Sequence, residues 1–280
     1  MVTAVFGGLS SSSPGACSRR LPSDRARNPW EVCLVESGMR IDIWSDIACP
    51  WCYIGLTRFD RVLAEFPHAD EVRVTLHSFQ LDPTLPDSYD GTESEYLAQA
   101  KRLPEAQVRQ MFSHVEAAAA TESLALDVDT IKVANSRKAH RLLHAAQDAD
   151  SSGRTAWALK TSLFRAHFTG GETISDPDTL VRLAREAGLD EATARDAIDS
   201  DARDLEVAGD IQDAVAYGIR GVPYFVFEEK YGISGAQPAE VFEEALAQVW
   251  DELHPAPVTK SLLTVPGAAD AEACGPEGCD

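Results

Sequence analysis

The stretch RIDIWSDIACPWCYIGL at residues 40–56 carries the strongest signal for the fold. Its first residues form a short β-type run, and the apolar residues that follow its cysteines continue at helical spacing. Between the two parts lie Cys49 and Cys52, in the motif C-P-W-C. Pro50 suits the first turn of a helix, where its missing N–H has no intrahelical partner to lose. The stretch therefore predicts a strand, a turn that carries two cysteines, and a helix.

This placement predicts redox chemistry for the cysteine pair. At a strand-to-helix turn, the first sulfur lies near free backbone N–H groups and the positive end of the helix dipole, which favours the thiolate. We expect Cys49 to be the nucleophile and Cys52, one turn later, to resolve a mixed disulfide. Pro50 and Trp51 add no charge, and Trp51 offers apolar area to a substrate. Asp46 either assists proton transfer to Cys52 or caps the helix or loop.

Other cysteines and histidines leave alternatives open. A zinc site needs a second ligand pair beside C-x-x-C, and only His140 with His144, or Cys274 with Cys279, offers one. The histidines fall in a helical pattern with apolar neighbours, and the cysteine pair has unusual spacing, so we predict no bound metal. Cys274 and Cys279 are either an accessory redox pair that relays electrons to Cys49 or inert thiols of a terminus.

The pattern of the whole chain predicts a core interrupted by helices. Residues 1–38 lack periodicity and predict a disordered leader; because Met39 directly precedes the first strand, we interpret the leader as a start-site artefact. Residues 39–91 and 218–253 predict β-α-β and β-β-α, and residues 92–217 predict four to six helices. Residues 254–280 indicate a flexible tail.

A second feature opens the later strand-like run at Val222-Pro223-Tyr224. A proline at this position is compatible with an edge strand or a turn. Beside C-x-x-C, a cis Val222–Pro223 bond would instead turn the Val222 backbone outward to pair with a substrate chain. Tyr224 would then flank the sulfurs, or else pack in the core.

Four segments together resemble a known family: DIACPWCYIG at 46–55, LFRAHF at 163–168, ISDP at 174–177 and GVPYF at 221–225. In this order they resemble the DsbA-like thioredoxin-fold oxidoreductases, specifically the FrnE-type branch. The resemblance covers residues 39–253. It implies an α/β thioredoxin fold, β-α-β then β-β-α, with a large all-helical insertion. It also implies a redox-active C-x-x-C faced by a cis proline.

Net charge and cysteine content exclude further classes of protein. The 280 residues carry 45 acidic side chains against 25 Lys and Arg, a net charge of −20, which excludes a nucleic-acid partner because no cationic cluster is present. Six cysteines are too few for a disulfide scaffold, and neither a membrane span nor a secretory signal is indicated, so we predict a cytoplasmic protein.

The predicted activity is that of a thiol:disulfide oxidoreductase, with isomerase activity as an extension. Its partners are proteins or small thiols, and no cofactor is required, with glutathione as a candidate co-substrate. Two alternatives stay open at this point. One is a glutathione-dependent isomerase or transferase for an aromatic or polyketide-like small molecule, since related families include 2-hydroxychromene-2-carboxylate isomerases and kappa-class glutathione transferases. The other is a zinc-binding adaptor.

Overall fold

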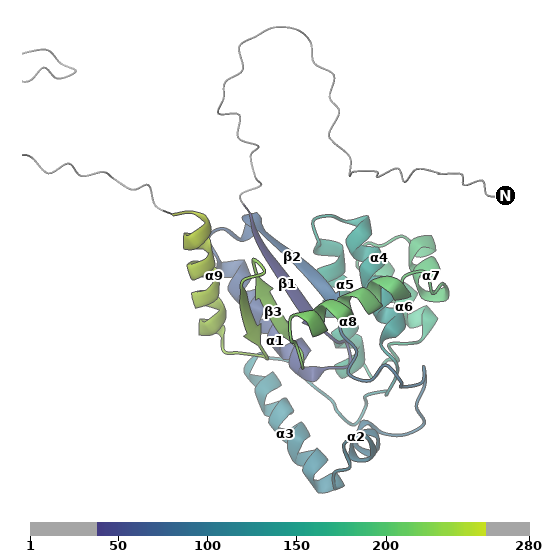
Figure 1. Ribbon diagram of the computed structural model, residues 1–280. Helices are drawn as coiled ribbons and strands as arrows, with labels where there is room; N and C mark the ends of the chain where they lie inside the picture. Colours follow the sequence, from purple (N-terminus) through teal and green to yellow (C-terminus); the bar gives the residue numbers. More distant parts are fainter. Residues whose placement is uncertain (1–37, 256–280) are drawn as a thin grey trace, which may run out of the picture. The chain divides into compact units, whose positions relative to one another are not determined.

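The computed structural model describes residues 38–255, within which four strands and nine α-helices are present (Figure 1). The predicted leader, apart from its last residue, and the Cys274–Cys279 pair lie outside the described residues. No helix in this range is long and apolar enough to cross a bilayer. Contacts do not divide residues 38–255 into smaller units, so the proposed boundaries around the helical insertion stay a prediction.

The sheet is built from both ends of the described chain. Strand β1 (Met39–Ser45) pairs in parallel with β2 (Val72–Ser78), and helix α1 (Pro50–Glu65) and a short 3-10 turn connect them. Strand β3 (Tyr224–Phe227) returns antiparallel to β1, and β4 (Tyr231–Ser234) forms the far edge. The order β2-β1-β3-β4 gives the mixed sheet that the sequence predicts for the core.

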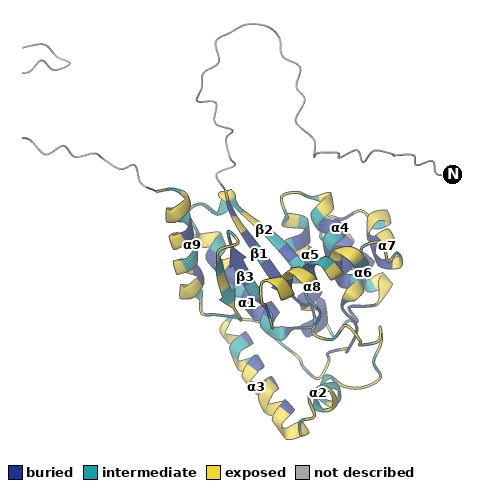
Figure 2. Cartoon of the chain, viewed as in Figure 1, coloured by how far each residue is buried: buried dark blue, intermediate teal, exposed yellow. Residues whose placement is uncertain are grey.

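Strand alternation gives the sheet two different faces. Ile43 and Phe225 point to the face covered by α1 and by α9 (Ala239–Leu253), where the Phe225 ring lies 4.8 Å from that of Phe242. Trp44 and Val226 point to the opposite face and form a smaller apolar cluster with residues of α8 and the segment after it. Most residues of β1 and β3 are buried (dark blue in Figure 2), whereas most residues of β2 and β4 are intermediate or exposed.

Seven helices lie between β2 and β3, one more than the upper limit of four to six predicted from the sequence. Their bounds are α2 Glu93–Lys101, α3 Glu105–Thr121, α4 Arg137–Ala149, α5 Arg154–Phe168, α6 Pro177–Glu186, α7 Glu191–Asp199 and α8 Asp204–Ala216. Helix α2 has no buried residue and so no apolar stripe to recognise. It is held instead by a capping box between Thr92 and Glu95.

Two predicted boundaries also need correction. Strand β3 begins at Tyr224 instead of Val222, because Pro223 has no N–H to donate to the ladder. Strand β2 ends at Ser78, before the predicted end near residues 79–81. After β3, the predictions for β4 and for the last helix, α9, are confirmed. Pro238 is the N-cap residue of α9.

The outer edge of β2 is closed by a side chain of α4. The Leu76 N–H donates to Oε1 of Gln147 at 2.7 Å, and Nε2 of Gln147 donates to the Leu76 carbonyl at 3.0 Å. The Gln147 amide thus pairs with the strand as a neighbouring peptide group would. One edge of the sheet is therefore attached directly to the helical insertion.

Candidate active site

The two cysteines occupy unequal positions at the start of α1. Cys49 is the N-cap residue and has extended backbone angles, and Pro50 follows as the first helical residue. Cys49 lines a surface cavity, whereas Cys52 is fully buried beneath it. Both are free thiols. Burial, together with a hydrogen bond to Cys49, raises the pKa of Cys52 well above its usual value.

The segment before β3 lies directly against this turn. The Val222–Pro223 bond is cis, and Sγ of Cys49 lies 3.6 Å from the Val222 carbonyl oxygen. Pro223 packs so closely on α1 that a Cβ on Gly55 would come within 2.9 Å of its ring. Glycine at position 55 is therefore required for the helix and this segment to meet.

The C-terminal end of α8 sets the direction in which the chain enters the Val222–Pro223 segment. Gly218 adopts φ = 73°, and its N–H donates to the Val215 carbonyl while the Ile219 N–H donates to the Ala214 carbonyl. This pair of bonds is the Schellman motif, which ends a helix and reverses the chain direction. Val222 follows three residues later, so the position of α8 determines where the carbonyl beside Cys49 lies.

A buried lysine lies close to the cysteine pair. Lys160 of α5 is 1% exposed, and its Nζ donates to the Ser45 carbonyl at 3.4 Å, the one hydrogen bond it makes to the described residues. Its ammonium also lies 5.3 Å from the centre of the Phe164 ring. Burial lowers the pKa of Lys160 to about 8, although the negative charges of Cys52, Asp46 and Cys49 oppose this shift.

Asp46 supplies a buried negative charge next to the same turn. Its carboxylate is 1% exposed and accepts hydrogen bonds from the Leu81 N–H at 2.8 Å and from Nε2 of His140 at 3.2 Å. Burial acts to raise the pKa of Asp46, but these hydrogen bonds hold it below its usual value. Burial also lowers the pKa of His140, so a neutral imidazole donates to an ionised carboxylate.

A cavity of about 530 Å³ opens beside Cys49. Its walls come from the start of α1, from Gly221 and Val222, from α2 and α3, and from residues 126–136. Most of the lining side chains are apolar, and Trp51, Phe112 and Phe168 are the largest of these. This size is typical of sites that bind small organic molecules.

Comparison with known proteins assigns the family. Residues 40–247 match the model of the DSBA-like thioredoxin domain. The crystal structure of a probable DsbA oxidoreductase from Streptomyces coelicolor is 38% identical, has a TM-score of 0.70, and covers 86% of this chain and 98% of its own. The chain belongs to the DsbA-like thioredoxin family. The resemblance found in the sequence is confirmed, and membership implies thiol-oxidoreductase-type activity.

Two more distant structures share the DsbA-like fold. The cytosolic disulfide reductase DsbM from Pseudomonas aeruginosa is 19% identical with a TM-score of 0.54, and the match covers 78% of this chain and all of that one. A 2-hydroxychromene-2-carboxylate isomerase is 13% identical with a TM-score of 0.58, covering 76% and 97%. Both a reductase and an isomerase are therefore built on this fold.

Of the residues singled out in the sequence, most meet at this DsbA-like site. Cys49, Pro50, Trp51 and Val222 all line the cavity, and the Trp51 ring contacts His114 of α3 edge to face at 5.4 Å. Tyr224 is not part of the lining; it packs with the Trp44 cluster on the face that α8 covers.

Sequence reasoning missed Lys160, which lies beside the cysteine pair, and Glu93, which lines the cavity. Lys160 falls on the apolar stripe of α5 with Leu159, Leu163 and Phe164, and a lysine at such a position is the available signal. Glu93 lies on α2, which has no stripe, so the sequence carries no comparable signal for it.

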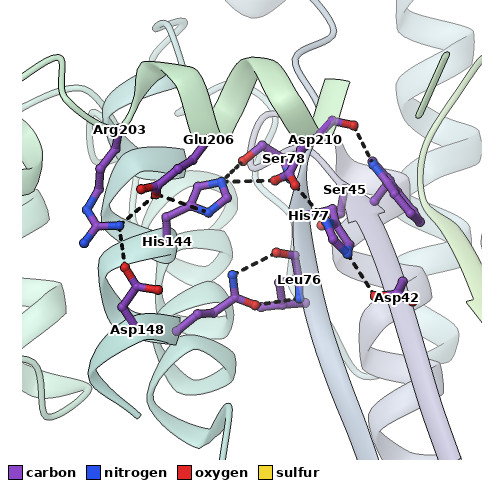
Figure 3. Close-up of polar contacts among 12 residues, drawn as sticks. Asp42, Ser45, Leu76, His77, Ser78, His144, Asp148, Arg203, Glu206 and Asp210 are labelled. Atoms are coloured by element: carbon purple, nitrogen blue, oxygen red, sulfur yellow. Dashed lines mark hydrogen bonds and ion pairs between the residues drawn. The ribbon is translucent and has the colours of Figure 1, made fainter. Parts of the chain in front are cut away.

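A separate cluster of charged groups, here called the His77 cluster, lies under α8 (Figure 3). It comprises Asp42, His77, His144 and Asp210. Nδ1 of His77 lies 2.7 Å from Asp210 and Nε2 lies 3.0 Å from Asp42, while Nε2 of His144 lies 3.0 Å from Asp210. The His77 ring also stacks on Trp44 at 4.3 Å. This cluster joins β1, β2 and α4 to the helix that leads into Val222.

Proposed function

We propose that this protein is a thiol:disulfide oxidoreductase that works through the C-P-W-C pair. The observation that carries the proposal is the unequal placement of the two sulfurs. Cys49 is 5% exposed and lines the cavity, from which a partner's sulfur can reach it, whereas Cys52 is fully buried and does not line the cavity. A pair with one accessible and one shielded thiol suits an attack by the first and resolution by the second.

In the reducing direction, the Cys49 thiolate attacks one sulfur of the partner's disulfide. A Cys49–partner disulfide forms and the partner's second sulfur leaves as a thiolate. The Cys52 thiolate then attacks the Cys49 sulfur, which forms the Cys49–Cys52 disulfide and releases the partner as a dithiol once protons are taken up. The reverse sequence oxidises a partner.

Lys160 supplies charge for the second step. Cys52 must lose its proton before it can attack, and burial opposes this because it raises the pKa of the thiol. A Lys160 ammonium lowers the Cys52 pKa by electrostatic attraction. With its own pKa near 8, Lys160 can also take up or release a proton close to neutral pH. We assign Lys160 as a positioning residue that stabilises the Cys52 thiolate.

The partner is held by the groups around the sulfur. The Val222 backbone offers hydrogen bonds to an extended chain, Pro223 orients that segment, and Pro50 and Trp51 provide apolar contact. A protein or a small thiol can take this position, glutathione can act as a co-substrate, and no cofactor enters any step. We further propose that the protein works in the cytoplasm, as the name of the similarly folded DsbM states for that protein.

Single-cysteine variants test the proposal. In an insulin-reduction assay, Cys49→Ser should lose at least about a thousandfold of the activity, because Cys52, the other described free thiol, is fully buried and does not line the cavity. Cys52→Ser should form a mixed disulfide that it cannot resolve, which intact-mass spectrometry would detect as an added partner mass. Cys49→Ser is the matched control and should form no adduct at residue 52.

The glutathione-dependent alternative makes the opposite forecast. An isomerase or transferase would keep its activity without Cys52 and would require added glutathione. Full insulin reduction by Cys49→Ser would refute the proposed mechanism outright.

A further inference from the structure

The cavity beside Cys49 has an uneven set of charges. Its charged lining consists of three acidic groups, Asp46, Asp82 and Glu93, and two basic ones, Lys101 and His167. Burial lowers the pKa of His167 to about 4, so this ring is neutral at physiological pH. Lys101 lies in the last turn of α2 and is exposed. The electrostatic balance of the cavity is therefore negative.

The acidic groups differ in how they are satisfied. Asp46 accepts the hydrogen bonds from Leu81 and His140 described above, and Asp82 accepts one from the Tyr96 hydroxyl at 2.8 Å. Glu93 makes no hydrogen bond or ion pair with any residue in the described part of the chain. It is half-buried, and burial raises its pKa to about 7. A carboxyl group in such a position lacks a cationic partner.

The remaining lining is apolar and comes largely from the helical insertion. Leu97 of α2, Met111 and Phe112 of α3, and Phe168 of α5 face the same cavity as Cys49. Met111 is 40% exposed, so its apolar side chain is available for contact with a ligand.

We propose that this cavity binds the apolar arm of a thiol or disulfide substrate, and that an amine at the end of this arm pairs with Glu93. The inference rests on the proposed function for its link to Cys49, because the arm lies in the cavity while the sulfur reaches the thiol. The cavity would therefore select apolar substrates that carry a cation over those that carry an anion.

The first experiment measures ligand binding to the cavity independently of the cysteines, with probes that contain no sulfur. Calorimetry would compare 4-ethylbenzylamine, 4-ethylbenzyl alcohol and 4-ethylbenzoate, which share one apolar body and differ in charge. The amine should bind about tenfold more tightly than the alcohol, as a charge-assisted hydrogen bond provides, and the benzoate most weakly.

Two glutamates of α2 give a matched pair of variants. Glu93→Gln should reduce amine binding to the level of the alcohol. Glu95→Gln removes the same charge from the same helix and preserves the capping box, which accepts Gln, so amine binding should stay within twofold. Equal losses in both variants, or benzoate binding as tight as amine binding, would refute the inference.

The second experiment joins the cavity to the sulfur chemistry. The Cys52→Ser variant would be mixed with symmetrical disulfides whose arms are phenethyl groups ending in aminomethyl, hydroxymethyl or carboxymethyl. We expect the aminomethyl disulfide to form the Cys49 adduct fastest, with its lead over the hydroxymethyl disulfide removed by Glu93→Gln. Amine binding without adduct from any disulfide would overturn the proposed function and leave the cavity assignment standing. Adducts at equal rates from all three would overturn the cavity assignment alone.

Discussion

Two polar clusters lie close to β1, one partly buried and one fully buried, and they differ in how their charges are compensated. The His77 cluster contains Asp42, His77, His144 and Asp210, and each of its carboxylates has a hydrogen-bond partner (Figure 3). The cysteine cluster contains Asp46, Cys52, His140 and Lys160. There, among residues 38–255, Lys160 has one hydrogen-bond acceptor, the Ser45 carbonyl at 3.4 Å.

The pKa shifts follow from this difference. In the His77 cluster, burial alone would lower the pKa of His77, but the hydrogen bonds to Asp210 and Asp42 raise it to about 9. The same bonds hold the pKa of Asp210 well below its usual range despite burial. In the cysteine cluster, the effect of burial exceeds the attraction of the nearby negative charges and lowers the pKa of Lys160 to about 8, close to physiological pH. Full pairing fixes charge and serves stability, whereas incomplete pairing leaves protons free to move.

The largest expected effect comes from breaking the His77 cluster. Asp210→Asn removes the carboxylate that His77, His144 and the Ser78 N–H share, and it leaves the partly buried, cationic His77 with Asp42 as its remaining carboxylate partner in the cluster. The free energy of unfolding should fall by about 3–5 kcal/mol in urea denaturation. Asp213→Asn, one turn further along α8 and exposed, is the control and should change it by less than about 0.5 kcal/mol. Equal effects would show that the cluster adds no stability.

The pH dependence of stability should show the same cluster. Because the folded pKa of His77 is above its ordinary 6.5, its contribution is complete below pH 6.5 and is lost as pH rises to about 9. The loss should reach about 3 kcal/mol. It is measured as the difference between wild type and His77→Gln, since the contribution of Lys160 changes with the opposite sign between pH 8 and 10.5, an interval that overlaps that of His77. A difference that does not change with pH would contradict the charged state of His77.

In the cysteine cluster, a substitution should act on rate and leave stability nearly unchanged. Lys160→Met keeps the apolar stem and removes the ammonium that stabilises the Cys52 thiolate, so release of the mixed disulfide should slow about tenfold at pH 7. Stopped-flow kinetics across pH 6–10 would also show a shifted pH profile, which a purely structural role would not produce. The unfolding free energy should stay equal or increase, because an incompletely paired buried charge is removed. Lys132→Met, at an exposed lysine, should alter neither quantity.

The smallest effect is expected at the rim of the His77 cluster. Arg203 lies 2.7 Å from Asp148 and 2.8 Å from Glu206, and both carboxylates are exposed to solvent. Arg203→Gln should change the unfolding free energy by less than about 0.5 kcal/mol, because exposed ion pairs contribute little. A loss above about 2 kcal/mol would mean that the stabilising network extends to the surface.

The sequence was enough to predict the core of the site and little of its surroundings. The strand, the turn with Cys49 and Cys52, and the helix are local in sequence, and β1 and α1 form where they were predicted. Lys160 lies more than a hundred residues from Cys52, and its proximity depends on how α5 packs. His140 and His144 looked like incidental histidines of one helix, yet they contact two different aspartates, Asp46 and Asp210. Such contacts arise from tertiary packing, which a single sequence does not encode locally.

The bond between Gln147 and Leu76 has a consequence for any attempt to shorten this protein. A core reduced to its sheet, α1 and α9 would expose the outer edge of β2, with the Leu76 N–H and carbonyl open to another chain. Two such cores would pair edge to edge and aggregate. The helical insertion therefore covers the sheet edge and prevents self-association, in addition to forming a wall of the cavity. A shorter version of this protein would need a charged residue or a proline on β2 to prevent edge-to-edge pairing.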